Sequence, residues 1–294
     1  MPWQKVALIG VGLLGGSIGL ALRQGRLAHS VVGYVRRPEA IVECQKIGVV
    51  DSATTDLQDA VQGADLVILC TPLGQMRDLT AKILPHLNSG AIITDVGSVK
   101  HSVHDALEPL CQNAGITFVG SHPMAGSEKM GVTAARVDLF QNALCVITAL
   151  ETTPASAVQR IEKFWSSLGA RILHLSPTVH DTFTARSSHL PHLVAAQLVN
   201  LILDPAHPLD QAALCANGFK DATRIASSSP EMWRDISLTN HVELGNALDQ
   251  FIEALQSFRT TLAAGDAERI GFLFQQAKNR RDAWASQSVL PPPA

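Results

Sequence analysis

The residues best suited to acid–base chemistry in this sequence are histidines that lie in short polar segments. His122 lies in residues 120–128 (GSHPMAGSE), directly after a short apolar stretch. A neutral imidazole with a pKa near ~6.5 can accept the proton of a hydroxyl group whose carbon loses a hydride. The alternative is that His122 only braces its loop through a hydrogen bond, and the residue type alone leaves both readings open.

A second pair of histidines, His189 and His192, lies in residues 187–192 (SSHLPH). Their spacing of three places both on one face of a helix, and Pro191 is tolerated in a first helical turn. A metal site would need a third ligand, which the sequence does not supply nearby. The pair therefore favours binding of an anion over binding of a metal.

Two cations follow at Lys220 and Arg224, four residues apart and so on one helix face. Their charges suit a substrate carboxylate, which Arg can bind with two hydrogen bonds. The alternative is an ordinary surface pair balanced by Asp221. Trp233, a little further on, offers a bulky wall for a pocket.

Near the N-terminus, residues 10–17 (GVGLLGGS) contain three glycines spaced as Gly-x-Gly-x-x-Gly. Gly10 permits a tight turn, Gly12 lets the backbone approach a pyrophosphate, and Gly15 lets a helix pack on a strand. The phosphates would bind the free N–H groups of the first helical turn, at Leu13, Leu14 and Gly15. The alternative is an ordinary glycine-rich turn between a strand and a helix.

The end of the next strand distinguishes between the two common dinucleotides. An acidic residue is expected there to hold the ribose 2′-OH of NAD. The chain instead has Arg36 and Arg37. Two guanidinium groups without a carboxylate suit a 2′-phosphate, so NADP is the expected cofactor and NAD the second choice. The alternative is a solvated charge pair in a loop.

The elements that must position these residues differ between the two halves of the chain. Up to about residue 176, short apolar strands alternate with helical stretches, which indicates a Rossmann-type α/β domain with a parallel sheet. Ligands bind beyond the C-terminal strand ends of such sheets, where Thr71, Pro72 and His122 fall. The strands are expected at residues 5–9, 31–34, 66–70, 91–95, 117–120, 144–148 and 171–175.

After Pro177 the sequence has helical periodicity, with helices expected at 189–203, 212–225, 232–263 and 266–284. We therefore expect a dinucleotide-binding domain at residues 1–176 and a helical domain for substrate binding and dimerisation at 177–287. Residues 288–294 are expected to form a tail. The long amphipathic run from 240 to 258 has an apolar face that needs a partner, which predicts a homodimer.

Composition excludes several other classes of protein. The 294 residues are 46% hydrophobic and 17% charged, with a net charge of −3, so we expect a globular protein that does not bind nucleic acid. No signal segment or membrane span is expected, and five scattered cysteines are typical of reduced thiols. The predicted location is the cytoplasm, with a small molecule as substrate.

The order of the motifs resembles the prephenate/arogenate dehydrogenase family of tyrosine biosynthesis. The resemblance extends from about residue 6 to residue 281 and rests on GVGLLGGS at 10–17, DVGSVK at 95–100, SHPMAG at 121–126, SHLPH at 188–192, GFKD at 218–221 and TRIA at 223–226. It implies oxidative decarboxylation of a cyclohexadienyl acid to an aromatic product, with NAD(P) as hydride acceptor. It also implies a nucleotide-binding domain followed by a helical dimerisation domain.

The resemblance implies roles for individual residues. His122 would accept the proton of the C4 hydroxyl while hydride leaves C4, and Ser98 would orient the same hydroxyl. Arg224 would hold a substrate carboxylate. The remaining substrate residues would be His189, His192, Ser127 and Glu128, with Lys220 and Trp233 in support.

The sequence leaves the choice of substrate open. Asn217 stands where some relatives have a glycine, which adds a polar group near the pocket and leaves side-chain selectivity undecided. Prephenate carries a ketone where arogenate carries an ammonium group, and the expected NADP preference tilts the choice slightly toward arogenate. Two rival readings are a dehydrogenase for β-hydroxyacids or pyrroline carboxylates, which would use a catalytic lysine, and a nucleotide-sensing module without turnover.

Overall fold

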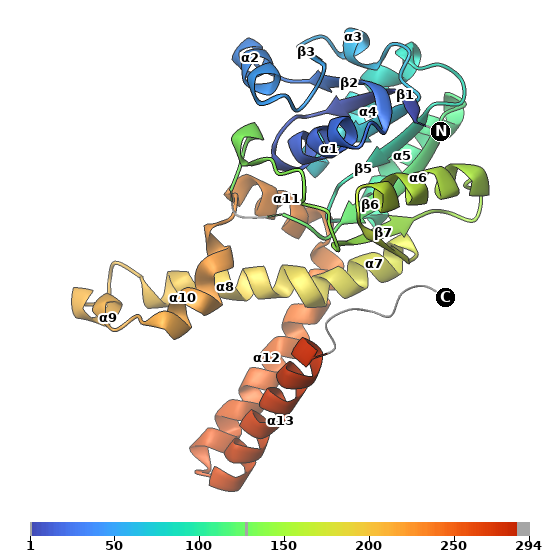
Figure 1. Cartoon of the computed structure of the whole chain (residues 1–294). Helices are drawn as coiled ribbons and strands as arrows, with labels where there is room; N and C mark the ends of the chain where they lie inside the picture. Colours follow the sequence, from blue (N-terminus) through green and yellow to red (C-terminus); the bar gives the residue numbers. More distant parts are fainter. Residues whose placement is uncertain (1, 127–128, 287–294) are drawn as a thin grey trace. The chain divides into compact units, whose positions relative to one another are not determined.

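The structure, a computed structural model, describes residues 2–126 and 129–286. The chain forms two compact units, Met1–Leu244 and Gly245–Ala294. The first unit contains the β-sheet and the helices that cover it (Figure 1). The boundary predicted at residue 176 was placed between a cofactor-binding domain and a substrate-binding domain. The division into compact units does not test that functional boundary, so it stays a prediction. The predicted tail at 288–294 lies outside the described residues.

Strands and helices alternate as far as β6 in the first part of the chain, and helices alone follow in the described part after residue 176. The order is β1 (Trp3–Ile9), α1 (Leu13–Gln24), β2 (Ala28–Tyr34), α2 (Pro38–Ile47), β3 (Ser52–Thr54), α3 (Leu57–Val61), β4 (Leu66–Leu69), α4 (Leu73–Ile83), β5 (Ile92–Asp95), α5 (His101–Asn113), β6 (Thr117–Pro123), β7 (Leu144–Thr148), α6 (Ala155–Ser167) and β8 (Arg171–His174). There follow α7 (Pro177–Thr184), the π turn η3 (Ala185–His189), α8 (Leu190–Ile202), α9 (Leu209–Ala213), α10 (Asn217–Thr223), the 3₁₀ turn η4 (Arg224–Ser227), α11 (Pro230–Thr239), α12 (His241–Ala263) and α13 (Ala267–Ser286).

The sheet has the strand order β3-β2-β1-β4-β5-β6-β7-β8. From β3 to β6 all neighbours are parallel, which confirms the Rossmann-type arrangement. The strand β7, however, is antiparallel to β6, and β8 is parallel to β7. A parallel neighbour would require a long crossover, usually a helix, whereas the described part of the β6–β7 connection holds only a 3₁₀ turn at Val132–Ala134. The expectation of a parallel sheet throughout is therefore wrong for the last two strands.

Successive side chains of a strand point to opposite faces of the sheet, and helices cover both faces. In β1, Val6 and Leu8 join a core that includes residues of α1 and α6. Ala7 and Ile9 join a second core with residues of α3, α4 and α5. All four side chains are fully buried, which explains the continuous apolar sequence of this strand.

Two predicted helices are interrupted in the structure. The helix expected at 212–225 is divided into the end of α9, α10 and η4, because Ala216 adopts an extended conformation. The helix expected at 232–263 ends and restarts at Asn240, where α11 stops and α12 begins. Asn240 is buried and its side chain bonds to other elements.

The second unit contains the remainder of α12 and the helix α13. The rings of Phe258 and Phe274 meet edge to face, with their centroids 6.1 Å apart. Within the described residues, no helix is long and apolar enough to cross a membrane.

Candidate functional site

A cleft of about 230 Å³ opens at the C-terminal ends of β1, β2 and β4. The structure thus brings together most of the residues that the sequence predicted for a cofactor. The cleft is lined by Gly10, Val11, Gly12, Tyr34, Val35, Arg36, Arg37, Ala40, Cys70, Thr71, Pro72, Gln75 and Leu79.

The glycines have the local geometry that a dinucleotide turn requires. Gly10 has φ +100°, and a Cβ there would lie 2.8 Å from the carbonyl oxygen of Cys70. A Cβ on Gly15 would lie 2.1 Å from the carbonyl oxygen of Gly10, so this position must also be small. A Cβ on Gly12 would meet no described atom within 4 Å, so the backbone here is open to a ligand. The turn therefore fits a pyrophosphate.

Helix α1 begins at this turn. Its N-cap is Gly12, and no described side chain caps it or places an acid in its first turn. Leu13, Leu14 and Gly15 form that turn, so their N–H groups carry the positive end of the helix toward the cleft. Arg36 and Arg37 are exposed at the opposite wall, after β2. The described lining contains no carboxylate.

The sequence predicted His122 in a loop beyond the strand. In the structure His122 instead lies within β6. The strand pairs with β5 only as far as Val119, and then continues along β7, where His122 is opposite Val146. Pairing with the antiparallel strand β7 thus continues β6 beyond the residues that pair with β5. The side chain of His122 is buried, with 7% of its surface exposed.

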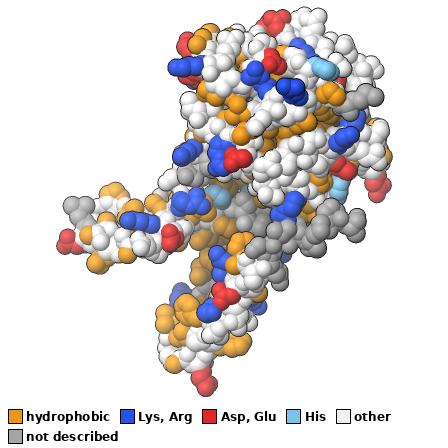
Figure 2. Space-filling view, viewed as in Figure 1, with side chains coloured by type: hydrophobic (Ala, Val, Ile, Leu, Met, Phe, Trp, Pro, Cys, Tyr) orange, Lys and Arg blue, Asp and Glu red, His pale blue; other side chains and the backbone are white. Residues whose placement is uncertain are grey.

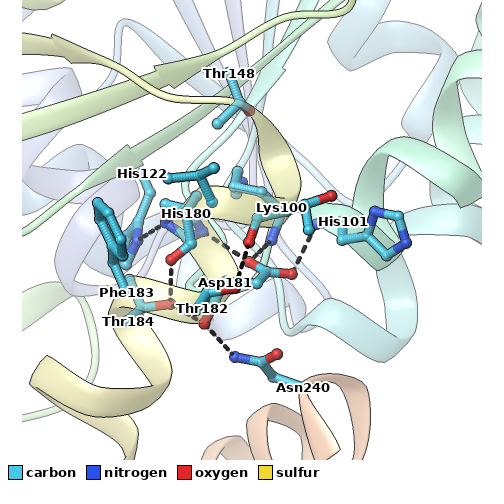
Figure 3. A network of polar contacts seen from close by, with 12 residues as sticks. Lys100, His101, His122, Thr148, His180, Asp181, Thr182, Phe183, Thr184 and Asn240 are labelled. Carbon is cyan, nitrogen blue, oxygen red and sulfur yellow. Dashed lines mark hydrogen bonds and ion pairs between the residues drawn. The ribbon is translucent and has the colours of Figure 1, made fainter. Parts of the chain in front are cut away.

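A chain of hydrogen bonds links His122 to an acid on helix α7 (Figure 3). The Nδ1 atom of His122 lies 2.8 Å from Nε2 of His180, and Nδ1 of His180 lies 2.7 Å from Oδ1 of Asp181. Asp181 also accepts the backbone N–H groups of Lys100 at 2.7 Å and His101 at 2.9 Å. It therefore fixes the start of α5 and the orientation of His180 at once.

These partners determine which nitrogen of each ring carries a proton. Burial raises the pKa of Asp181, but the hydrogen bonds from His180 and the two backbone N–H groups outweigh it and hold that pKa below its usual value. As a carboxylate, Asp181 only accepts, so His180 must donate from Nδ1. Burial and the charge of Lys100 together lower the pKa of His180 more than Asp181 and Asp95 raise it, so the ring is neutral and its Nε2 accepts from Nδ1 of His122. The Nε2 atom of His122 is thus left without a proton.

A buried ion pair lies beside this chain. Lys100 is fully buried and its Nζ donates to Oδ2 of Asp95 and, at 2.9 Å, to the carbonyl oxygen of Ser121. Burial lowers the pKa of His122 well below its usual value, and the nearby His180, Lys100 and His189 lower it further. The sequence predicted an ordinary imidazole pKa for His122. Because the pKa is lower, His122 is neutral over a wider pH range than expected.

His189 and His192 share one face, as predicted, and both contact Trp233. The ring of His192 stacks on that of Trp233 at 3.9 Å, and the ring of His189 meets it edge to face at 6.0 Å. His189 closes the π turn η3, a distortion that often occurs at functional sites. Burial lowers the pKa of His189 to about 4. The pKa of His192 is also lowered, chiefly by burial and to a smaller extent by the charge of Arg224.

The other predicted substrate residues are less closely joined to His122. Ser98 is half-buried between β5 and α5, and its backbone affects the pKa of His189. Arg224 and Lys220 are exposed at and before the start of η4, which packs on α8. In the described part of the chain no hydrogen bond or ion pair joins Lys220 to the histidines. Ser127 and Glu128 lie outside the described residues.

Sequence reasoning missed His180, Asp181 and Asn240, and gave Lys100 no role. The hydrogen-bonded partners are 58 residues apart for His122 and His180, and 51 residues apart for Asn240 and His189. No periodicity spans such distances. A His-Asp pair directly after the last strand was the available signal.

Comparison with known proteins identifies related chains over almost the whole length. Residues 18–174 match the family model for the nucleotide-binding domain of prephenate dehydrogenase, and residues 176–276 match the model for its dimerization domain. Prephenate dehydrogenase of Bacillus subtilis is 37% identical over 283 residues, which is 94% of this chain and 75% of that protein.

Two solved structures extend the comparison to three dimensions. Prephenate dehydrogenase from Aquifex aeolicus, in complex with hydroxyphenyl propionate and NAD+, superimposes with a TM-score of 0.90 at 31% identity, covering 96% of this chain and 99% of that one. Arogenate dehydrogenase from Synechocystis has a TM-score of 0.80 at 30% identity, covering 96% of this chain and 100% of that one.

Proposed function

The chain belongs to the prephenate dehydrogenase family, and from this membership we propose that it oxidatively decarboxylates prephenate, arogenate or both. The proposal rests chiefly on the chain of hydrogen bonds from Asp181 through His180 to His122. This chain leaves His122 as a neutral imidazole with a free Nε2. Such a nitrogen can accept the hydroxyl proton that must leave when C4 is oxidised.

The residues then have the following roles. When bound, the nicotinamide supplies the acceptor for the hydride from C4. His122 takes the C4 hydroxyl proton at Nε2, and the resulting positive charge is stabilised through His180 by the carboxylate of Asp181. As the C1 carboxylate leaves as CO₂, its bonding electrons complete the aromatic ring. His122 returns the proton to the phenolate oxygen and ends the cycle neutral.

Ser98 is proposed to orient the hydroxyl group, and Arg224 to bind a substrate carboxylate. Arg224 lies close enough to His192 to affect its pKa, so its charge belongs to the same region as the two histidines of η3 and α8. His189, His192, Ser127, Glu128 and Lys220 complete the proposed substrate site.

We also propose that NADP is the preferred cofactor. Arg36 and Arg37 line the cleft that contains Gly10 and Gly12, and the described lining has no acid to hold a free ribose 2′-OH. Guanidinium groups bind a 2′-phosphate with charge-assisted hydrogen bonds. The Aquifex aeolicus relative was solved in complex with NAD+, which is the second choice proposed for this chain.

A homodimer is proposed for the assembly. The second unit exposes large apolar side chains, among them Leu255, Leu262, Phe272, Phe274 and Trp284. Figure 2 shows hydrophobic side chains on the visible surface of this unit. Such a surface favours association. Light scattering should give twice the chain mass, and a monomer at micromolar concentration would contradict the proposal.

The experiment that tests the function is a steady-state matrix of prephenate and arogenate against NADP and NAD. We expect turnover of at least one acid, with CO₂ released in equal amount to the reduced cofactor and a higher kcat/KM with NADP. Activity on a β-hydroxyacid alone, or cofactor binding without turnover of either dienyl acid, would support one of the two rival readings instead.

A further inference from the structure

Asn240 joins the two groups of histidines from the break between α11 and α12. Its side chain is buried, with 4% exposed. The Nδ2 atom lies 3.0 Å from the main-chain oxygen of Asp181 and 3.1 Å from Nδ1 of His189. Figure 3 shows the amide of Asn240 directed toward the Asp181 segment of α7.

The orientation of this amide follows from its partners. A main-chain carbonyl can only accept a hydrogen bond, so the atom that faces the Asp181 oxygen must be the NH₂ group of Asn240. The same NH₂ group faces Nδ1 of His189 and has a second proton to donate. Nδ1 of His189 must therefore be the acceptor.

The tautomer of His189 is then determined. Burial lowers its pKa to about 4, so the ring is neutral near pH 7 and carries one proton. Because Nδ1 accepts, that proton is on Nε2. The Nε2 atom is buried and meets no described atom at full hydrogen-bond geometry, while a backbone hydrogen bond with Ser98 raises the pKa of His189. A buried N–H group whose hydrogen bond is not at full geometry is a donor that a ligand oxygen can engage.

His122 is the opposite tautomer, with its proton on Nδ1 and none on Nε2. The carboxylate of Asp181 places a proton on Nδ1 of His180 and, through it, on Nδ1 of His122. Asp181 thus makes His122 an acceptor at Nε2 with its side chain, while its main-chain oxygen orients the amide that makes His189 a donor at Nε2.

We infer that Asn240 is a positioning residue that holds His189 as an Nε2–H donor for an acceptor oxygen of the substrate. The inference rests on the proposed function for the identity of that substrate, a dienyl carboxylic acid. His189 contributes binding by a neutral donor, and His122 contributes proton transfer. A loss of Asn240 should therefore affect KM more than kcat, because Asp181 holds His122 independently.

The direct test is the protonation state of His189 in the full-length protein. Long-range ¹H–¹⁵N NMR of ¹⁵N-histidine-labelled protein distinguishes a protonated from a bare ring nitrogen, and His189→Gln identifies the signals of His189. We expect Nε2 protonated and Nδ1 bare at neutral pH. A proton on Nδ1 would overturn the inference, whatever the activity of the enzyme.

Two variants then test the role of the amide. Asn240→Leu removes both hydrogen bonds and should give His189 a mixture of tautomers, with KM for the dienyl acid raised about 10-fold and kcat changed less. Asn240→Asp offers only acceptors, so His189 should move its proton to Nδ1 and its pKa should rise toward the usual value.

The matched control is Thr239→Ala, the adjacent residue, whose hydroxyl bonds, among the described residues, to the carbonyls of Asp235 and Ile236 in its own helix. It should keep the wild-type tautomer and KM. Unchanged tautomer and KM in Asn240→Leu would overturn the inference. If wild-type protein turned over neither acid, the proposed function would fail, while the NMR result would still decide the tautomer.

Discussion

The cofactor cleft and the histidine site are built in opposite ways. The cleft consists mostly of backbone, with Gly10, Gly12 and the start of α1 within a few residues of one another and exposed arginines at its edge. The histidine site consists of buried side chains from β6, α7, η3 and the α11–α12 junction. The first is an open surface that a ligand completes, and the second is a preorganised network of defined proton positions.

This difference separates binding from chemistry. Changes in the cleft should alter which dinucleotide binds and leave the proton-transfer residues intact. Changes in the histidine site should alter turnover or substrate binding and leave the cleft intact.

The largest effect is expected for His122→Asn. Asparagine cannot accept the hydroxyl proton at the position of Nε2, so kcat should fall by about 10²–10⁴-fold. Cofactor affinity, measured by fluorescence titration, should stay within about twofold of wild type because His122 does not line the cleft. A near-normal kcat would remove His122 from its proposed role.

The cleft is tested by Arg36→Asp. The carboxylate should repel a 2′-phosphate and accept the ribose 2′-OH, so the ratio of kcat/KM for NADP over NAD should fall by about 10- to 100-fold. Arg77→Asp on the exposed surface of α4, which is not in the cleft lining, provides a charge-matched control. An unchanged ratio in Arg36→Asp would show that this guanidinium is a bystander.

A smaller effect is expected for Arg224→Ala. Removing an exposed guanidinium that is proposed to bind a carboxylate should raise KM for the dienyl acid about 10-fold, with a lesser change in kcat. The KM of the cofactor should not change. If the KM of the acid were also unchanged, the carboxylate would be bound elsewhere.

The sequence predicted those parts of the molecule that depend on local spacing. The glycine turn, the arginines after β2 and most strands are patterns within a few residues, and the shared face of His189 and His192 follows from helical spacing. The β3 strand has three residues, too few for any periodicity. The reversal of β7 depends on a connection without a crossover helix, and the apolar sequence of β7 is compatible with either strand direction.

The histidine network could not be predicted because its bonds join distant segments. His180, Asp181 and Asn240 become meaningful only when α7 packs beside β6 and the α11–α12 junction. Lys100 is unusual as a fully buried lysine, and its burial depends on Asp95 and the Ser121 carbonyl on neighbouring strands. Fold class was therefore available from the sequence, while the proton positions required the structure.

We propose that the buried network keeps His122 neutral with Nε2 free, and the pH dependence of kcat/KM tests this protonation state. Burial lowers the pKa of His122 well below its usual value, so the base stays deprotonated as the pH falls through ~6.5. We predict a flat profile from pH 8 to below pH 6 for the preferred acid, with the acid limb at lower pH. A half-maximal fall near pH 6.5, as for an ordinary exposed histidine, would show that the network does not keep His122 neutral at that pH.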